Sequence, residues 1–280
     1  MYPVLLEIPS LGISIPSWHL LYALSALWAY LFLHFLARSF FPTLNPGVLD
    51  KGYLAGYVAS YLGARCISIL IEESPQSLGD FLSKVIVLGP MTFYGGLIGC
   101  TIGISLVLWK EKVSLRHAID LFFPVGLSTL FLGRIGCFLN GDDYGIPADL
   151  SNGPPWWSIQ IPALNDQIFR HPVQLYEAAY SLLSTCAWIV LLRLTKGKDR
   201  VSGLVGITSL SVYAIFRFNI EWLRDDPRGS WRGFSTSQIL SVLILMANLA
   251  AAAVILFRQF RAALHRRPHG AANETLPEEQ

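Results

Sequence analysis

Ionisable and polar side chains interrupt several long apolar stretches of this 280-residue chain. Such groups are costly inside a lipid bilayer and usually mark a binding or catalytic site. Guanidinium groups are permanently charged and hold phosphate oxygens in a planar fork, so Arg134 and Arg217 indicate a site for an anionic headgroup, with Glu221 one helical turn further on. Gly95 and Gly96 lack side-chain bulk and permit close backbone approach. The other polar candidates are His19, Arg65, Tyr94, Asn140, Asp142, Asp143, Arg170 and His171.

Each candidate also has a purely structural explanation. Arg134 and Arg217 could reach the lipid headgroups by snorkelling, and Glu221 could simply pair with Arg217 four residues earlier. Tyr94 could belong to an interfacial aromatic belt, and His171 could lie in the cap of a helix that begins just after it. A shared site is favoured because the candidates converge on one membrane level.

The elements that must position these residues are membrane-spanning helices. Hydrophobic residues make up 53% of the chain and charged residues 14%, with a mean hydropathy of +0.47. A soluble domain carries about 25% charged residues, so this composition excludes a soluble enzyme, a disordered chain and a disulfide scaffold. A spanning helix needs about 20 apolar residues. We therefore predict an all-α polytopic membrane protein with seven transmembrane helices, at 19–40, 48–71, 88–109, 117–139 (interrupted by Pro124), 172–194, 202–222 and 235–257.

The lysines and arginines predict the orientation of these spans. They gather in the connections after the first, third and fifth spans and after the last one. The connection after the second span instead carries Glu72, Glu73 and Asp80 against Lys84. We therefore expect the N-terminus outside and the C-terminus in the cytoplasm.

The spans define the expected domain organisation. We expect residues 1–262 to form one transmembrane domain with an outer loop at 140–171, and residues 263–280 to form a disordered cytoplasmic tail. In this arrangement the polar candidates lie near the outer leaflet. Asp120 is the main polar residue of the cytoplasmic half.

Several other functions are disfavoured. The net charge of +2 is too small to indicate a nucleic-acid partner. The four cysteines show neither CxxC pairing nor metal-ligand spacing, and no glycine pattern indicates a nucleotide cofactor. We expect neither a metal nor a cofactor. Trp156 and Trp157 in the outer loop are typical of an interfacial anchor, with a lid over a lipid site as the alternative.

Five segments carry a resemblance to a known family. They are FYGGLIG at 93–99, GRIGCFLNGDDYG at 133–145, RHPVQLYE at 170–177, FRFNIEWLRDD at 216–226 and FSTSQILS at 234–241. In this order they resemble the prolipoprotein diacylglyceryl transferases of bacterial inner membranes. The resemblance implies transfer of the diacylglyceryl group of phosphatidylglycerol to the lipobox cysteine in the signal peptide of a preprolipoprotein. A thioether forms and glycerol 1-phosphate departs, in the first step of lipoprotein maturation.

The resemblance also assigns roles to individual residues. Arg134 matches an arginine expected to contact phosphatidylglycerol, and Arg217 matches a second essential arginine, near the departing phosphate. Glu221 matches the glutamate one turn later. Asn140 and Gly145 match the asparagine and the closing glycine of the GRxG segment.

Four positions depart from the family pattern. Cys137 stands at a common asparagine position and Asp142 at a glutamate position. Tyr94 stands where many members have histidine, and His19 where many have tyrosine. We hypothesise that Tyr94 and His19 have exchanged a phenol and an imidazole across one site.

The departures leave the general base open. The acceptor thiol must become a thiolate before it attacks carbon. His19, His171 or the positive charge of Arg134 and Arg217 could promote this. Direct attack by the substrate cysteine makes a covalent intermediate on Cys137 unnecessary.

Two alternative functions stay open. A divergent family member could use another acceptor or another anionic lipid. A non-enzymatic lipid-binding or transport protein could use the same polar cluster for docking, although the apolar cytoplasmic half offers no polar path through the bilayer.

Overall fold

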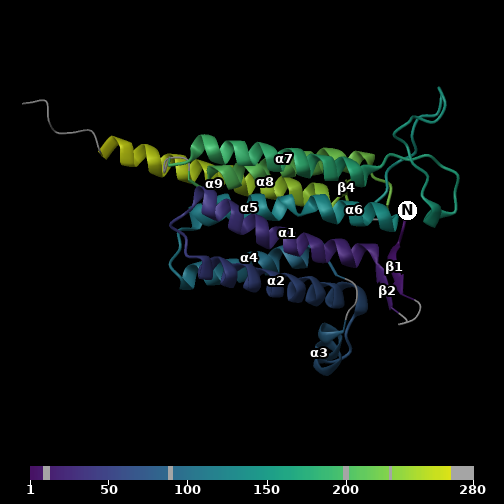
Figure 1. The fold of residues 1–280 in the computed structure, drawn as a ribbon, viewed down its shortest axis with the longest axis horizontal. Coiled ribbons are helices and arrows are strands. Elements are labelled where there is room, and N and C mark those ends of the chain that lie inside the picture. Colours follow the sequence, from purple (N-terminus) through teal and green to yellow (C-terminus); the bar gives the residue numbers. More distant parts are fainter. Residues whose placement is uncertain (9–12, 88–90, 198–201, 227–228, 266–280) are drawn as a thin grey trace, which may run out of the picture.

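The computed structural model describes residues 1–8, 13–87, 91–197, 202–226 and 229–265 (Figure 1). Its long helices run alongside one another, and each of the seven predicted stretches corresponds to a helix or to a pair of helices. They are α1 (Ser17–Phe40), α2 (Pro46–Ser68), α4 (Phe93–Lys110), α5 (Leu115–Ser128) with α6 (Leu130–Asn140), α7 (Val173–Thr195), α8 (Leu204–Ile220) and α9 (Thr236–His265).

Five of the described helices are long and apolar enough to cross a membrane. They cover Ser17–Phe40, Pro46–Ile71, Leu115–Asn140, Val173–Thr195 and Thr236–Arg261, and the apolar helix Gly95–Lys110 is shorter. The chain is therefore a helical polytopic membrane protein, as the composition predicts. Helix α9 continues to His265, past the predicted start of the tail at residue 263. The rest of that predicted tail, 266–280, lies outside the described residues.

The break in the fourth stretch was expected at Pro124, and this prediction is wrong. Pro124 is buried inside α5, and the helix breaks five residues later, at Thr129. A proline removes one backbone donor, but helices packed among other membrane helices tolerate this loss. At the break, the Thr129 hydroxyl donates to the Gly126 carbonyl at 2.6 Å.

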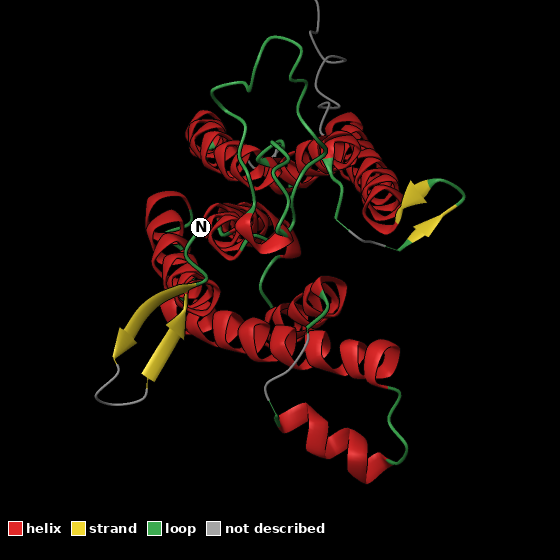
Figure 2. Cartoon of the chain, turned by 90° about the vertical axis from the view of Figure 1, so that its right-hand side faces the viewer, coloured by secondary structure: helices red, strands yellow, loops and turns green. Residues whose placement is uncertain are grey.

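Several short elements were not expected. A hydropathy window of about 20 residues averages over segments this short. They are the hairpin of β1 (Val4–Ile8) with β2 (Ile13–Pro16), a π-helical turn at Ile69–Glu73, α3 (Leu78–Ile86), and the hairpin of β3 (Ser230–Trp231) with β4 (Phe234–Ser235) (Figure 2).

Helices α2 and α4 pack closely along a row of small residues. Gly95, Gly99 and Gly103 recur every four residues on α4, the spacing that lets membrane helices approach. A Cβ atom on Gly99 would collide with the carbonyl oxygen of Ala59 on α2, and one on Gly95 with that of Gly63. These close backbone contacts fix how the two helices pack.

Gly99→Ala should therefore force α2 and α4 apart. Overpacking of this kind costs about 1–3 kcal/mol, which should appear as a lower melting temperature of the detergent-solubilised protein. Gly126→Ala is the matched control, because nothing lies within 4 Å of its Cβ position and alanine favours helix over glycine. Equal melting temperatures for the two variants would contradict this packing.

Two ionisable residues within the helices have structural partners. Asp120, 3% exposed, accepts from the backbone N–H of Gly203 at 2.6 Å and of Gly206 at 2.8 Å, so it caps the start of α8. Arg65 on α2 donates through Nε to the carbonyls of Lys84 at 3.1 Å and Val87 at 3.2 Å. It therefore ties the end of α3 to α2.

Candidate functional site

Arg134 and Arg217, the two arginines on which the predicted site depends, meet at one carboxylate. The carboxylate is that of Glu177, near the start of α7. Its Oε2 lies 2.6 Å from Nε of Arg134 on α6, and its Oε1 lies 3.4 Å from Nη1 of Arg217 on α8. The three side chains are 16%, 8% and 5% exposed for Arg134, Arg217 and Glu177. Side chains from three distant sequence segments are thus brought together near the ends of three helices.

A third guanidinium joins them from the segment after α8. Arg224, whose side chain is 2% exposed, places Nη1 at 3.4 Å from Oε2 of Glu177 and Nε at 2.9 Å from Asp226. Its Nη2 forms an ion pair with Asp143. The backbone sets this position, because Gly145 and Arg224 face each other in an antiparallel bridge. Glu177 therefore contacts guanidiniums from three different segments.

Asp143 links two of these arginines. It forms ion pairs with both Arg134 and Arg224. The chain turns back here because Gly141 adopts a left-handed conformation at the end of α6, with φ of 84°. Burial alone would raise the pKa of Asp143, but the charges of Arg134 and Arg224 outweigh it and hold the pKa below its ordinary value. The carboxylate is therefore ionised at neutral pH.

Glu221 and Tyr213 complete the face of α8. Glu221 Oε2 lies 2.7 Å from Nη1 of Arg217, and Nη2 of Arg217 donates to the Ser237 hydroxyl of α9 at 3.0 Å. Tyr213 lies one turn before Arg217 on α8, and its ring lies 6.4 Å from that of Tyr180 on α7.

The residues between α6 and α7 border this cluster. Asn140 donates to the side chain of Asp142 at 2.8 Å, and the fully buried Gln174 donates to the Asp142 backbone carbonyl. Gly145 is buried so tightly that a Cβ atom there would lie 2.7 Å from the side chain of Val173. Asn140, Asp142 and Gly145 therefore shape the loop that carries Asp143.

Arg170 holds the outer loop in place. Its guanidinium pairs with Asp166 at 3.0 Å and with Asp225 at 2.6 Å, and it lies over the Tyr144 ring at 5.2 Å. These contacts join the loop to the segment that carries Arg224. Arg170 is thus a structural element beside the site.

His171 lies at the start of α7, close to the bordering loop. Its Nδ1 is 3.3 Å from the Tyr176 hydroxyl, and its ring lies 4.5 Å from that of Trp157, whereas Trp156 is 95% exposed. Burial lowers the pKa of His171, so the imidazole is neutral at pH 7. None of its described contacts is with the three arginines.

The remaining candidates lie in other surroundings. His19 is exposed and contacts the Trp18 ring edge-on at 5.3 Å. Gly95 packs against Gly63, and Gly96 lies beside Ser60 of α2. The side chain of Tyr94 is outside the described part of the structure, so the exchange between Tyr94 and His19 stays a prediction. So do the lipid contacts of the two glycines, which already have a packing role.

Glu177 and Arg224 were not singled out in the sequence, although both lie in segments that carry the family resemblance. A signal for Glu177 was present, because it is the only acidic residue of the span predicted at 172–194. Arg224 and Asp226 follow the predicted end of a span and read as interfacial charges.

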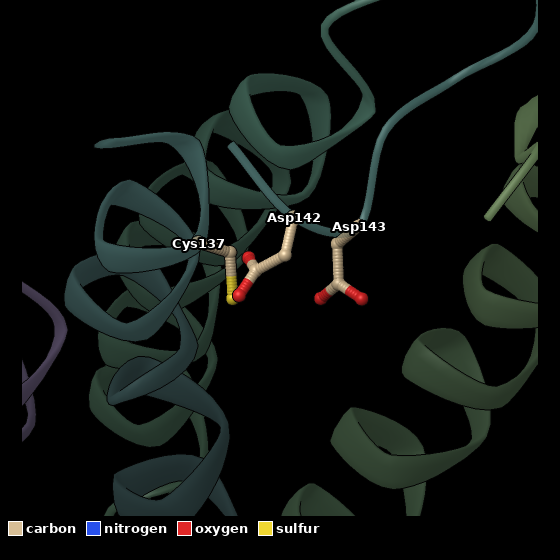
Figure 3. Close-up of side chains that lie close together, drawn as sticks. All are labelled: Cys137, Asp142 and Asp143. Atoms are coloured by element: carbon tan, nitrogen blue, oxygen red, sulfur yellow. The ribbon is translucent and has the colours of Figure 1, made fainter. Parts of the chain in front are cut away.

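Cys137, Asp142 and Asp143 lie close together (Figure 3). Their potential ligand atoms all fall within 4.8 Å of one another. However, Asp143 is already paired with two guanidiniums, and these positive charges oppose a cation. The surroundings suit an anion better, and the expectation of no metal stays a prediction.

The sequence is similar to a described family over nearly its whole length. The family model for prolipoprotein diacylglyceryl transferase matches residues 3–254. A phosphatidylglycerol–prolipoprotein diacylglyceryl transferase of Clostridium tetani is 28% identical over 264 residues, which cover 92% of this chain and 100% of the relative. Proteins of the same name are 31% identical in Erythrobacter litoralis, over 69% of each chain, and 32% identical in Geobacter sulfurreducens, over 69% of this chain and 73% of the relative.

Proposed function

Because this chain belongs to the prolipoprotein diacylglyceryl transferase family, we propose that it transfers the diacylglyceryl group of phosphatidylglycerol to a cysteine thiol of a prolipoprotein. The observation that carries this proposal is the gathering of Arg134, Arg217 and Arg224 around Glu177. Guanidiniums held together in a dry site are suited to a phosphodiester whose acyl chains stay in the bilayer.

The proposed reaction is a displacement at carbon. The acceptor thiol loses its proton to a base, and the thiolate sulfur attacks the glyceryl carbon that carries the phosphate ester. The carbon–oxygen bond breaks as the carbon–sulfur bond forms, and glycerol 1-phosphate leaves with the electron pair. Arg134 and Arg217 bind the phosphate oxygens, where negative charge increases as the bond breaks. Glu221 holds Arg217 in place at 2.7 Å.

The same proposal includes seven spans, with the N-terminus and the site on the periplasmic side of the inner membrane. The N-terminal hairpin, α6 and the hairpin of β3 with β4 lie at one end of the helices (Figure 1), and Arg134 of the arginine cluster lies on α6. Lys51, which pairs with Glu111 at 2.6 Å, and Lys196 lie at the connections predicted to be cytoplasmic. This distribution supports the orientation.

Helix α3 fits this orientation as an interfacial element. It presents Leu78, Leu82 and Ile86 on one face, with exposed fractions of 75%, 54% and 83%, and pairs Asp80 with Lys84 at 3.0 Å elsewhere. A short amphipathic helix between two membrane helices is suited to lying in the headgroup region.

Leu82→Cys labelled with a polarity-sensitive fluorophore should therefore emit at shorter wavelength in liposomes than Ser83→Cys labelled in the same way. Lipids that carry a quencher near the headgroup should quench the first label more strongly. Identical spectra and quenching at the two positions would place α3 in water instead.

We propose His171 as the group that accepts the thiol proton, since its imidazole is neutral at pH 7. His171→Gln should lower kcat/KM at pH 7 by about 100-fold, within the usual range for a general base. The loss should shrink as pH approaches about 8.5, where the free thiol ionises on its own. A variant with the wild-type pH profile would assign thiolate formation to the charge of the arginines.

Reconstitution tests the proposed function directly. The purified protein in phosphatidylglycerol liposomes should add a diacylglyceryl group to a lipobox peptide, detected by mass spectrometry, and release glycerol phosphate. A peptide with serine in place of the lipobox cysteine should stay unmodified. Lipid movement between vesicles without any peptide modification would instead support a binding or transport protein.

A further inference from the structure

The arginine cluster carries no excess positive charge. Three guanidiniums, of Arg134, Arg217 and Arg224, face four carboxylates. These carboxylates belong to Asp143, Glu177, Glu221 and Asp226. The positive charge of a site that must bind an anionic phosphate is therefore already balanced by carboxylates of the chain itself.

Glu177 differs from the other three carboxylates in its position. Its two oxygens face all three guanidiniums at 2.6, 3.4 and 3.4 Å, from the middle of the cluster. Asp143 and Asp226 lie in loops, and Glu221, in the 3-10 turn that follows α8, pairs with Arg217 four residues earlier. Arg224 Nη1 donates a hydrogen bond to Glu177 at 3.4 Å, whereas Arg134 and Arg217 contact Glu177 as ion pairs. Glu177 therefore shares one negative charge among three guanidiniums.

We propose that Glu177 is a positioning residue that holds the place of a phosphate oxyanion among the three arginines and limits the affinity of the site for phosphate. This inference rests on the proposed function. The Glu177 carboxylate keeps the three guanidiniums pointing toward one position while no lipid is bound. Its charge then opposes every phosphate that enters.

Repulsion between the Glu177 carboxylate and a bound phosphate affects the release of the product. The substrate phosphodiester carries one negative charge, whereas a phosphate monoester carries about −1.5 to −2 at pH 7. Without the charge of Glu177, the three guanidiniums would hold the more highly charged product more tightly than the substrate. A fixed carboxylate weakens binding of the product more than binding of the substrate, because the repulsion grows with the charge of the ligand. Glu177 thereby favours product release, which limits many enzymes.

Glu177→Gln tests this inference, because glutamine keeps the shape and one oxygen acceptor but removes the charge. Inhibition by added glycerol 1-phosphate should become stronger by about tenfold or more, and the KM for phosphatidylglycerol should fall. At the same time kcat should decrease because product leaves slowly. A carboxylate with a merely structural role would give the opposite sign, with weaker inhibition and a higher KM.

Glu177→Asp keeps the charge but withdraws it by one methylene. Inhibition and KM should shift in the same direction by a smaller amount, and kcat should recover toward wild type. This variant keeps the inference testable if Glu177→Gln does not fold. Inhibition that is unchanged or weaker in both variants overturns the inference. A wild-type protein that transfers no lipid overturns the proposed function instead, so the two failures are distinguishable.

Discussion

Arg134→Lys should abolish most of the transferase activity, although it conserves the charge. Arg134 uses Nε for Glu177 and Nη1 for Asp143, so its planar group is held by two carboxylates at once. An ammonium group is a point charge on a flexible stem and cannot reproduce this fork. Loss of one aligned donor to a developing oxyanion costs about 10²–10³-fold in kcat. We expect a loss of that size in the initial rate of lipobox-peptide modification in phosphatidylglycerol liposomes.

Arg193→Lys is the matched control for this prediction. Arg193 is exposed in the last turn of α7, at the end opposite to Glu177. The control should retain wild-type activity and the wild-type melting temperature, as expected for a substitution at an exposed position. If Arg134→Lys kept more than half of the activity, the phosphate contact would need only a charge and not a fork.

Helix positions were predictable because the bilayer sets them. The thickness of the hydrocarbon core requires about 20 apolar residues per span, and this requirement acts on the sequence alone. The same length explains why α3 and the two hairpins were not predicted, because they are shorter than a hydropathy window of about 20 residues. Pro124 misled for a related reason, since a proline signals a break only when no neighbouring helix supports the freed carbonyl.

Depth was predictable, whereas the partner of each polar side chain was not. The sequence places Arg134 and Arg217 at one membrane level, and the structure brings them to the same carboxylate. The sequence alone does not reveal which face of each helix points toward the other helices. That orientation decides whether Glu177 contacts an arginine or a lipid. Asp120 illustrates the same limit, because its partners at Gly203 and Gly206 follow more than eighty residues later.

The glycines of α4 show that one residue type can serve two purposes. Gly95 and Gly96 were expected to admit a headgroup, since glycine permits close backbone approach. The structure places them against Gly63 and Ser60 of α2. A glycine pair in a membrane helix indicates that something approaches closely, and the sequence alone does not say whether it is a lipid or another helix.

Arg224→Ala should cost more stability than any other single change in the cluster. The Arg224 side chain is 2% exposed and pairs with Glu177, Asp143 and Asp226. Removing one partner of a buried ion pair leaves uncompensated charge and costs about 3–5 kcal/mol. The melting temperature of the detergent-solubilised protein should therefore fall steeply. Arg38→Ala, at an exposed site in the last turn of α1, should have no effect.

Adding Asp143→Asn to Arg224→Ala should recover part of the lost stability, because one of the carboxylates left without Arg224 is then neutral. If the losses from the two single changes simply added, Asp143 would be held chiefly by Arg134 and not by Arg224.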